Sequence, residues 1–184
     1  MRAKIFDSTL RDGAQAEGIS FLVGDKIKIA KALDDLGVDF IEAGNPGSNQ
    51  KDMEFFQEMK KIPLKSACLC AFGATRRKNI TCEKDLNLKS LLEAGTSCVV
   101  IFGKSSSSQV KQIIGTSLKE NLSMIKETVA YMKSNGRKVI YDAEHFFTAF
   151  AEDKDYALAT LTAALEGGAE YLTLCETKGG FMMD

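Results

Sequence analysis

The chain has 184 residues, of which 45% are hydrophobic and 27% are charged, and its formal net charge is −1. This balance is typical of a globular protein and predicts one domain over residues 1–184, while the near-neutral charge offers no general field for nucleic acid or an anionic membrane. The N-terminus opens on an alternating apolar segment without a charged leader, and no run approaches the roughly 20 apolar residues of a membrane span. We therefore expect a cytoplasmic protein that binds neither nucleic acid nor membrane.

Short apolar runs alternate with helical patterns along the chain. The first strand is expected at 4–6, and the helix after it has apolar residues at 3.6-residue spacing and ends at Gly37. Further strands are expected at 38–43, 66–72, 98–102, 139–142 and 171–175. Apolar residues within 53–59, 86–92, 122–129 and 156–165 predict the helices between them. The serine-rich run 105–108 is expected to form a flexible loop.

The strict alternation of strand and helix requires crossover connections, so the strands should be parallel. No Gly-x-Gly-x-x-Gly follows the first strand, which favours a barrel over a dinucleotide-binding sheet. The predicted fold class is α/β, a (β/α)8 TIM barrel of which the chain supplies about six of eight strand–helix units. We expect the barrel to stop before strands 7 and 8. Its open edge would then be available to another chain, for example in a homodimer.

The five cysteines are odd in number, and three of them lie inside apolar runs that resemble buried strands. A disulfide scaffold is therefore not predicted. Cys68 and Cys70 alternate on one strand and should face the same side, but no Cys-x-x-Cys pair is present to complete a zinc site with them. We expect the cysteines to be small buried core residues.

An adjacent cation and carboxylate, Arg11 and Asp12, stand where the first strand ends, in the stretch Asp7-Ser8-Thr9-Leu10-Arg11-Asp12-Gly13-Ala14-Gln15. The carboxyl ends of barrel strands carry the active site. A hard divalent cation prefers a carboxylate, and a nearby arginine can stabilise an oxyanion on a substrate bound to that cation. The dipeptide alone is weak evidence for such a site, because without further context a plain surface ion pair is the more common explanation.

Several motifs at successive strand ends resemble one family in order along the chain. They are the stretch above, Glu17-Gly18-Ile19-Ser20-Phe21, Asp39-Phe40-Ile41-Glu42-Ala43-Gly44, Pro46-Gly47-Ser48-Asn49, Phe72-Gly73-Ala74-Thr75-Arg76-Arg77, Phe102-Gly103-Lys104-Ser105 and Tyr141-Asp142-Ala143-Glu144-His145-Phe146-Phe147. The sequence resembles the metal-dependent acyl-CoA condensing superfamily, which includes citramalate, 2-isopropylmalate and homocitrate synthases and hydroxymethylglutaryl-CoA lyase. The citramalate-synthase branch is the most similar.

This resemblance implies a Claisen condensation, in which the enolate of acetyl-CoA attacks a 2-oxo acid such as pyruvate and water then hydrolyses the thioester. It implies a divalent cation, Mg, Mn or Zn, with Asp12 as a metal ligand. Arg11 would stabilise the developing oxyanion, and Glu144 would orient the substrate or take part in proton transfer. The expected substrate-binding residues are Gln15, Glu42, His145 and Thr177. His145, the only histidine, could instead be a satisfied structural residue.

The chain departs from the family pattern mainly in loops, at 105–109, 148–149, 176–178 and Asn45. These departures suggest either altered substrate choice or relaxed function. The His-x-His metal ligands that the resemblance implies are expected beyond Asp184. Two alternatives therefore stay open beside the condensing acyltransferase: a carbon–carbon lyase of the hydroxymethylglutaryl-CoA lyase type, and an inactive fragment or degenerate paralogue that needs a partner chain.

Overall fold

The computed structural model of the protein describes residues 2–176 and residue 179. Its centre is one parallel sheet of six strands in the order β1-β2-β3-β4-β5-β6. Neighbours in the sheet are thus neighbours in the sequence, as barrel topology requires. The strands are β1 (Phe6–Asp7), β2 (Phe40–Glu42), β3 (Cys68–Ala74), β4 (Cys98–Lys104), β5 (Lys138–Glu144) and β6 (Tyr171–Leu174).

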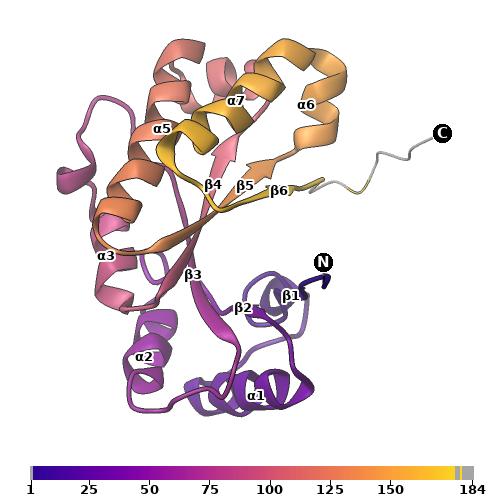
Figure 1. Ribbon diagram of the computed structural model, residues 1–184, viewed down its shortest axis with the longest axis vertical. Coiled ribbons are helices and arrows are strands. Elements are labelled where there is room, and N and C mark those ends of the chain that lie inside the picture. Colours follow the sequence, from indigo (N-terminus) through magenta and orange to yellow (C-terminus); the bar gives the residue numbers. More distant parts are fainter. Residues whose placement is uncertain (1, 177–178, 180–184) are drawn as a thin grey trace.

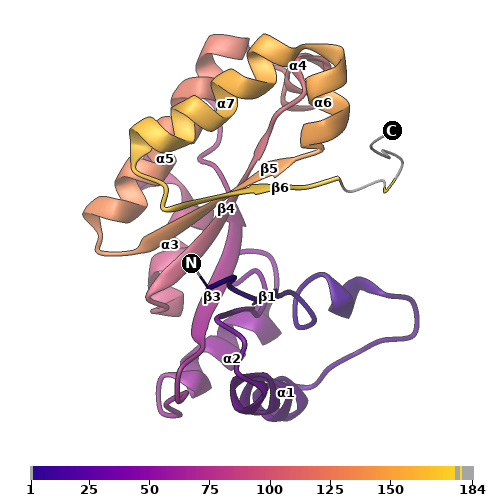
Figure 2. The ribbon, with the colours of Figure 1, turned by 45° about the vertical axis from the view of Figure 1, so that its right-hand side comes forward.

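The connecting helices lie on the outer face of this sheet (Figure 1). They are α1 (Val23–Leu36), α2 (Gln50–Met59), α3 (Leu86–Ala94), α5 (Leu118–Ser134), α6 (Phe146–Glu152) and α7 (Lys154–Gly167), together with the short turns η1 (Gly13–Gln15), η2 (Cys82–Lys84), α4 (Ser107–Gln109) and η3 (Val110–Ile114). Figure 2 shows α5 and α7 side by side, and both helices pack on the sheet, α5 against β4 and β5 and α7 against β5. Within the described part of the chain, no helix is long and apolar enough to cross a membrane.

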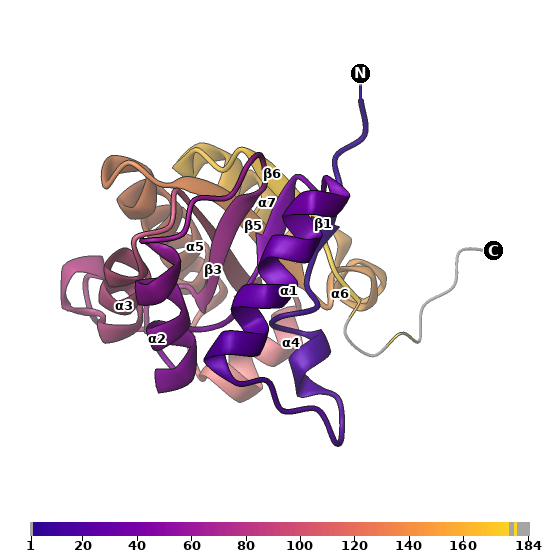
Figure 3. The ribbon, with the colours of Figure 1, turned by 90° about the horizontal axis from the view of Figure 1, so that it is seen from below.

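The sheet curls until its two edge strands approach each other (Figure 3). Lys4, just before β1, donates a hydrogen bond of 2.5 Å to the hydroxyl of Tyr171 on β6. The ring of Tyr171 also packs edge-on against Phe40 of β2, with centroids 5.4 Å apart. Residues of strands that are far apart in the sheet order can meet in this way only on the concave side of a strongly curved sheet. The predicted partial barrel of six parallel strands is therefore confirmed.

Side chains alternate between the two faces of the sheet, as the two-residue period of a strand requires. Ile41, Val99 and Tyr141 point outward into the main core, where they pack against the helices. Phe40 and Ile140 point into the barrel, and so do the cysteines of β3 and β4. Cys70, Cys82 and Cys98 are buried as expected, whereas Cys68 and Cys175 are only half-buried.

The expected strand positions hold, although the boundaries shift. The first strand begins two residues later than predicted. Ile5 N donates to the Asp39 carboxylate instead of to a backbone carbonyl, and Ile5 O accepts from both Asp39 N and Phe40 N. Gly37 ends α1 as predicted, with φ at 86°, a left-handed conformation that glycine adopts without strain.

The flexible loop predicted for residues 105–108 is wrong. Ser105 and Ser106 are fully buried. The Ser106 hydroxyl caps α4 by accepting from Gln109 N at 3.3 Å, and it donates to the Glu152 carboxylate at 2.9 Å. Serine-rich composition suggested mobility, but these hydroxyls are bound by a helix end and by a carboxylate from α6, a helix that the apolar periodicity did not indicate.

Candidate active site

A cavity of about 630 Å³ opens at the carboxyl ends of the strands. Its walls come from the β1 turn and from the ends of β3, β4, β5 and β6, through Arg11, Asp12, Gln15, Phe72, Phe102, Asp142, Glu144, Cys175 and Glu176. Four of the predicted site residues thus meet in one cavity. Glu42 and His145 lie beside it, and Thr177 is outside the described residues.

The turn after β1 presents the arginine and its carboxylate neighbour. Ser8 O accepts hydrogen bonds from the backbone N–H groups of Arg11, Asp12 and Gly13, at 3.1, 2.9 and 3.1 Å. Leu10 is 1% exposed and anchors the turn in the core. The buried leucine and the shared carbonyl leave both charged side chains at the rim of the barrel.

Arg11 is held on three sides. Its Nε donates to Glu42 Oε2 at 2.6 Å, and its Nη1 donates to Asp12 Oδ1 at 3.0 Å. The guanidinium carbon lies 4.1 Å from the centroid of the Phe72 ring, a cation–π contact. Phe72 is itself stacked on Phe102, with centroids 5.1 Å apart and planes 10° apart. The guanidinium is therefore fixed in position on the wall of the cavity.

Two carboxyl groups deep in the site have perturbed acidity. Burial raises the pKa of Glu42 to about 7, with Arg11 acting in the opposite direction and the carboxylates of Asp142 and Asp12 adding to the rise. Burial also raises the pKa of Asp142, which Cys175 and Arg11 oppose. Carboxyl groups perturbed in this way are typical of functional sites.

Glu144, the last residue of β5, lies beside a lysine from the neighbouring strand. Lys104 Nζ is 2.5 Å from Glu144 Oε2, an ion pair whose alignment is not that of a hydrogen bond. His145 has a left-handed backbone with φ at 54°, an uncommon conformation for a residue with a side chain. Its Nε2 is 3.9 Å from Glu144 Oε1 and its Nδ1 is 3.7 Å from Glu176 Oε1. The His145 side chain is 11% exposed and lies between two glutamates at the cavity edge.

Two departures from the family pattern contact each other. Thr148 on α6 donates to Glu176 Oε2 from its backbone N at 3.0 Å and from its hydroxyl at 3.1 Å. Burial alone would raise the pKa of Glu176, but the Thr148 hydrogen bonds and the adjacent His145 outweigh it and lower that pKa. Residues that looked like unrelated loop changes therefore form one polar contact on the cavity wall.

Gly44 turns the chain sharply after β2. Its φ is 138°, and a Cβ there would lie 2.3 Å from the Asp52 carboxyl carbon. That carboxylate accepts from Asn45 N at 2.8 Å and from Lys26 Nζ at 2.5 Å, which ties the loop to α1 and α2. Asn45 and Gln15 line a smaller adjoining cavity of about 210 Å³.

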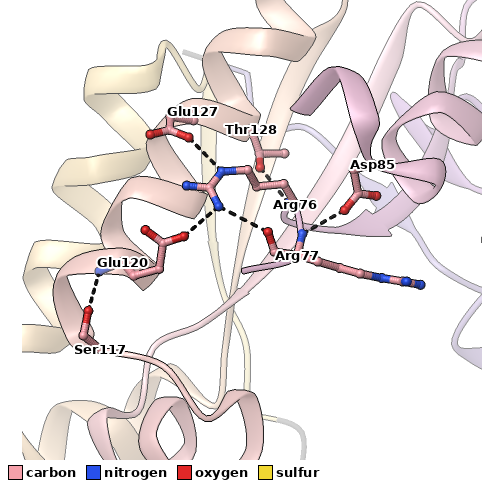
Figure 4. A network of polar contacts seen from close by, with 7 residues as sticks. All are labelled: Arg76, Arg77, Asp85, Ser117, Glu120, Glu127 and Thr128. Atoms are coloured by element: carbon pink, nitrogen blue, oxygen red, sulfur yellow. Dashed lines mark hydrogen bonds and ion pairs between the residues drawn. The ribbon is translucent and has the colours of Figure 1, made fainter. Parts of the chain in front are cut away.

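A second arginine fixes the end of β3 without entering the cavity (Figure 4). The Arg76 side chain is 6% exposed and bonds Glu120 at 2.8 Å and Glu127 at 2.7 Å, both on α5. Its backbone N donates to Thr128 Oγ1 at 2.8 Å. The end of β3 is therefore fixed to α5, and the same strand carries Phe72, whose ring packs against Arg11.

The motifs did not single out Asp142 or Lys104 as site residues. A signal for Asp142 existed, because it precedes Glu144 by two residues on one strand and must face the same side. Lys104 is paired in register with Glu144, a relation that strand boundaries alone do not provide.

The donor set of the cavity fits a hard divalent cation. Asp12, Asp142 and Glu144 line the same space. Asp142 Oδ1 is buried and has no hydrogen-bond partner among the described residues. Carboxylate oxygens are the ligands that Mg²⁺ and Mn²⁺ prefer. In the described residues these carboxylates do not converge as a three-ligand cluster.

Comparison with known proteins decides the family, because the HMGL-like family matches residues 2–184. The chain belongs to the HMGL-like family. This membership confirms the family resemblance of the strand-end motifs. The solved structure of the HMG-CoA lyase of Bacillus subtilis superposes with a TM-score of 0.76 at 19% identity, over 97% of this chain and 59% of that one, and so shares the fold.

Curated relatives of this HMGL-like chain include synthases. The (R)-citramalate synthase of Synechocystis sp. is 52% identical over 176 residues, and that of Sulfolobus acidocaldarius is 49% identical over 177 residues. The 2-isopropylmalate synthase of Sulfurisphaera tokodaii is 33% identical over 178 residues, 97% of this chain and 43% of the relative. The two citramalate synthase alignments cover 96% of this chain but 32% and 34% of the relatives, so the chain spans about one third of their length.

Proposed function

We propose that the complete protein is an acyltransferase that condenses acetyl-CoA with a small 2-oxo acid, pyruvate in the first instance, in a reaction of the citramalate-synthase type. The observation that carries the proposal is the fixed guanidinium of Arg11 in a cavity lined by four carboxylates. Identities near 50% to (R)-citramalate synthases, against 19% to the HMG-CoA lyase, favour condensation over the lyase alternative.

In this proposal, Arg11 acts on the oxygen that becomes negative during reaction. The interactions described for Arg11 engage Nε and Nη1, so Nη2 is suited to donate to a substrate oxygen. A donor fixed before reaction stabilises the enolate or alkoxide without reorganisation of its own. Glu42, beneath the guanidinium, positions Arg11 and does not reach the substrate.

Glu144 takes part in moving the methyl proton of acetyl-CoA. It lies on the cavity wall, and Lys104 fixes its carboxylate. The carbanion then forms a bond to the carbonyl carbon of the 2-oxo acid, whose carbonyl oxygen becomes an alkoxide and takes up a proton. Water then attacks the thioester carbonyl, and cleavage of the C–S bond releases the CoA thiol. His145 and Glu176 orient the substrate from the α6 side of the cavity.

Asp12 and Asp142 would hold the divalent cation, with Asp142 Oδ1 as the buried donor. When bound, such a cation polarises the carbonyl and carboxylate oxygens of the 2-oxo acid. Its positive charge would also oppose the rise in the pKa of Asp142, which burial causes and the carboxylates of Glu144 and Asp12 increase.

The test is an assay of the complete protein with acetyl-CoA and a series of 2-oxo acids of increasing size. Release of CoA thiol and formation of a 2-hydroxy diacid are measured with Mg²⁺ or Mn²⁺ and after chelation. We expect turnover with pyruvate that chelation abolishes and Asp142→Asn reduces by about 10²-fold or more. Asp155→Asn, on the exposed side of α7, is the matched control. Absence of condensation with every 2-oxo acid by folded, cation-loaded protein would overturn the proposal.

A further inference from the structure

Three cysteines converge on one point inside the barrel, one layer below the cavity. They are Cys68 and Cys70 of β3 and Cys98 of β4, and their sulfur atoms all lie within 4.8 Å of one another. Cys70 and Cys98 are register partners on adjacent strands and are fully buried, whereas Cys68 is partly exposed. None of the three lines the cavity at Arg11, so the cluster is a separate feature.

The surroundings of the cluster are polar on one side. Cys68 Sγ is 3.3 Å from the hydroxyl oxygen of Ser97. Lys138 is the register partner of Cys98 on β5 and therefore starts from the same face of the sheet. A lysine next to thiols favours their thiolate form. On the other side Phe40, Val100 and Ile140 enclose the sulfur atoms.

A purely apolar packing role explains this arrangement poorly. Bulky branched residues dominate the interior layers of a barrel. Here three small thiols occupy neighbouring inward positions, and all three are free. One disulfide among them would leave the third sulfur without a partner. A single cation can engage all three at once.

We propose that Cys68, Cys70 and Cys98 form a binding site for a thiophilic cation of the Zn²⁺ or Cu⁺ class, held by three thiolates with the Ser97 hydroxyl beside the open position. Sulfur atoms bound tetrahedrally at about 2.3 Å from a metal lie about 3.8 Å apart. The sulfur atoms here are up to 4.8 Å apart, and side-chain rotations that move them by about 1 Å bring them to this distance. Soft sulfur ligands select this class over Mg²⁺. The three thiol protons pass to solvent as the cation binds.

The site is tested by titrating the reduced, metal-free chain with Cd²⁺, whose bonds to sulfur produce a charge-transfer absorption in the ultraviolet. We expect one equivalent to saturate this absorption and Zn²⁺ to displace it. Cys98→Ser should lower the intensity by about one third and weaken binding at least about 10-fold, because one of three soft ligands is lost. Cys82→Ser, which changes a buried cysteine outside the cluster, should leave both values unchanged. An absorption that Cys98→Ser does not alter would overturn the proposal.

A second measurement keeps the test independent of how well Cys98→Ser folds. Wild-type chain is treated with a thiol alkylating reagent with and without Cd²⁺, and the modified cysteines are identified by mass spectrometry. Cd²⁺ should protect Cys68, the partly exposed member of the cluster. Equal modification of Cys68 in both samples would show that no cation is held there. Cu⁺ is then added in place of Cd²⁺, and its competition with Zn²⁺ shows which of these two metals the site binds more tightly.

Discussion

Replacement of Glu42 by glutamine should change how the stability of the protein depends on pH. Glu42 is 1% exposed, and burial raises its pKa from 4.5 to about 7. A carboxyl group with a raised pKa in the folded state binds more protons there than in the unfolded chain. The stability that this group contributes is therefore complete below pH 4.5 and is lost as pH rises toward about 7.

The size of the loss follows from the two pKa values. Each pKa unit corresponds to about 1.4 kcal/mol, so moving from below pH 4.5 to above pH 7 should remove about 3 kcal/mol of unfolding free energy. In the Glu42→Gln variant the side chain cannot ionise, but its amide oxygen can still accept a hydrogen bond from Arg11 Nε. The unfolding free energy of the wild type minus that of the variant should therefore fall by about 3 kcal/mol across this range and then level off.

The assay is urea unfolding of both proteins at a series of pH values, with chelator present so that bound cations do not contribute. Taking the difference between the proteins cancels the titration of all other groups. Glu127→Gln controls for the substitution itself, because Glu127 also accepts from an arginine but is half exposed. A difference that rises with pH would show that the ion pair with Arg11 outweighs burial, which would refute the reasoning.

Three further changes have outcomes that the structure predicts. In the complete enzyme, Arg11→Lys should lower kcat by roughly 10²-fold in steady-state assays, while KM for the 2-oxo acid changes much less. The substitution keeps the positive charge but removes the planar set of N–H donors of the guanidinium. Arg76→Met should lower the urea-derived unfolding free energy by about 2 kcal/mol, less than for a fully buried pair because water reaches Glu120 and Glu127. Gly44→Ala should lower the melting temperature more than Gly37→Ala, because only the Gly44 Cβ meets another side chain.

The fold was largely predictable because its signals are local. Apolar runs with a period of two, helices with a period of 3.6 and a helix end at Gly37 each depend on a few neighbouring residues. The serine run at 105–108 failed for the opposite reason. Its order comes from Glu152, which is far away in sequence, so composition could not reveal it.

The candidate site was predictable one strand at a time but not across strands. Motifs placed Arg11 and Glu144 correctly at strand ends, and the alternation within a strand then implies Asp142. The register between strands could not be predicted in this way, because it depends on the tilt of the strands in the barrel and is not determined by any single segment. Lys104 meets Glu144, and Cys98 meets Cys70, only because β4 is aligned with its neighbours in one way. A shift of β4 by one residue would turn Cys98 and Lys104 to the outer face, so both the ion pair at the cavity and the three-sulfur cluster depend on that one register.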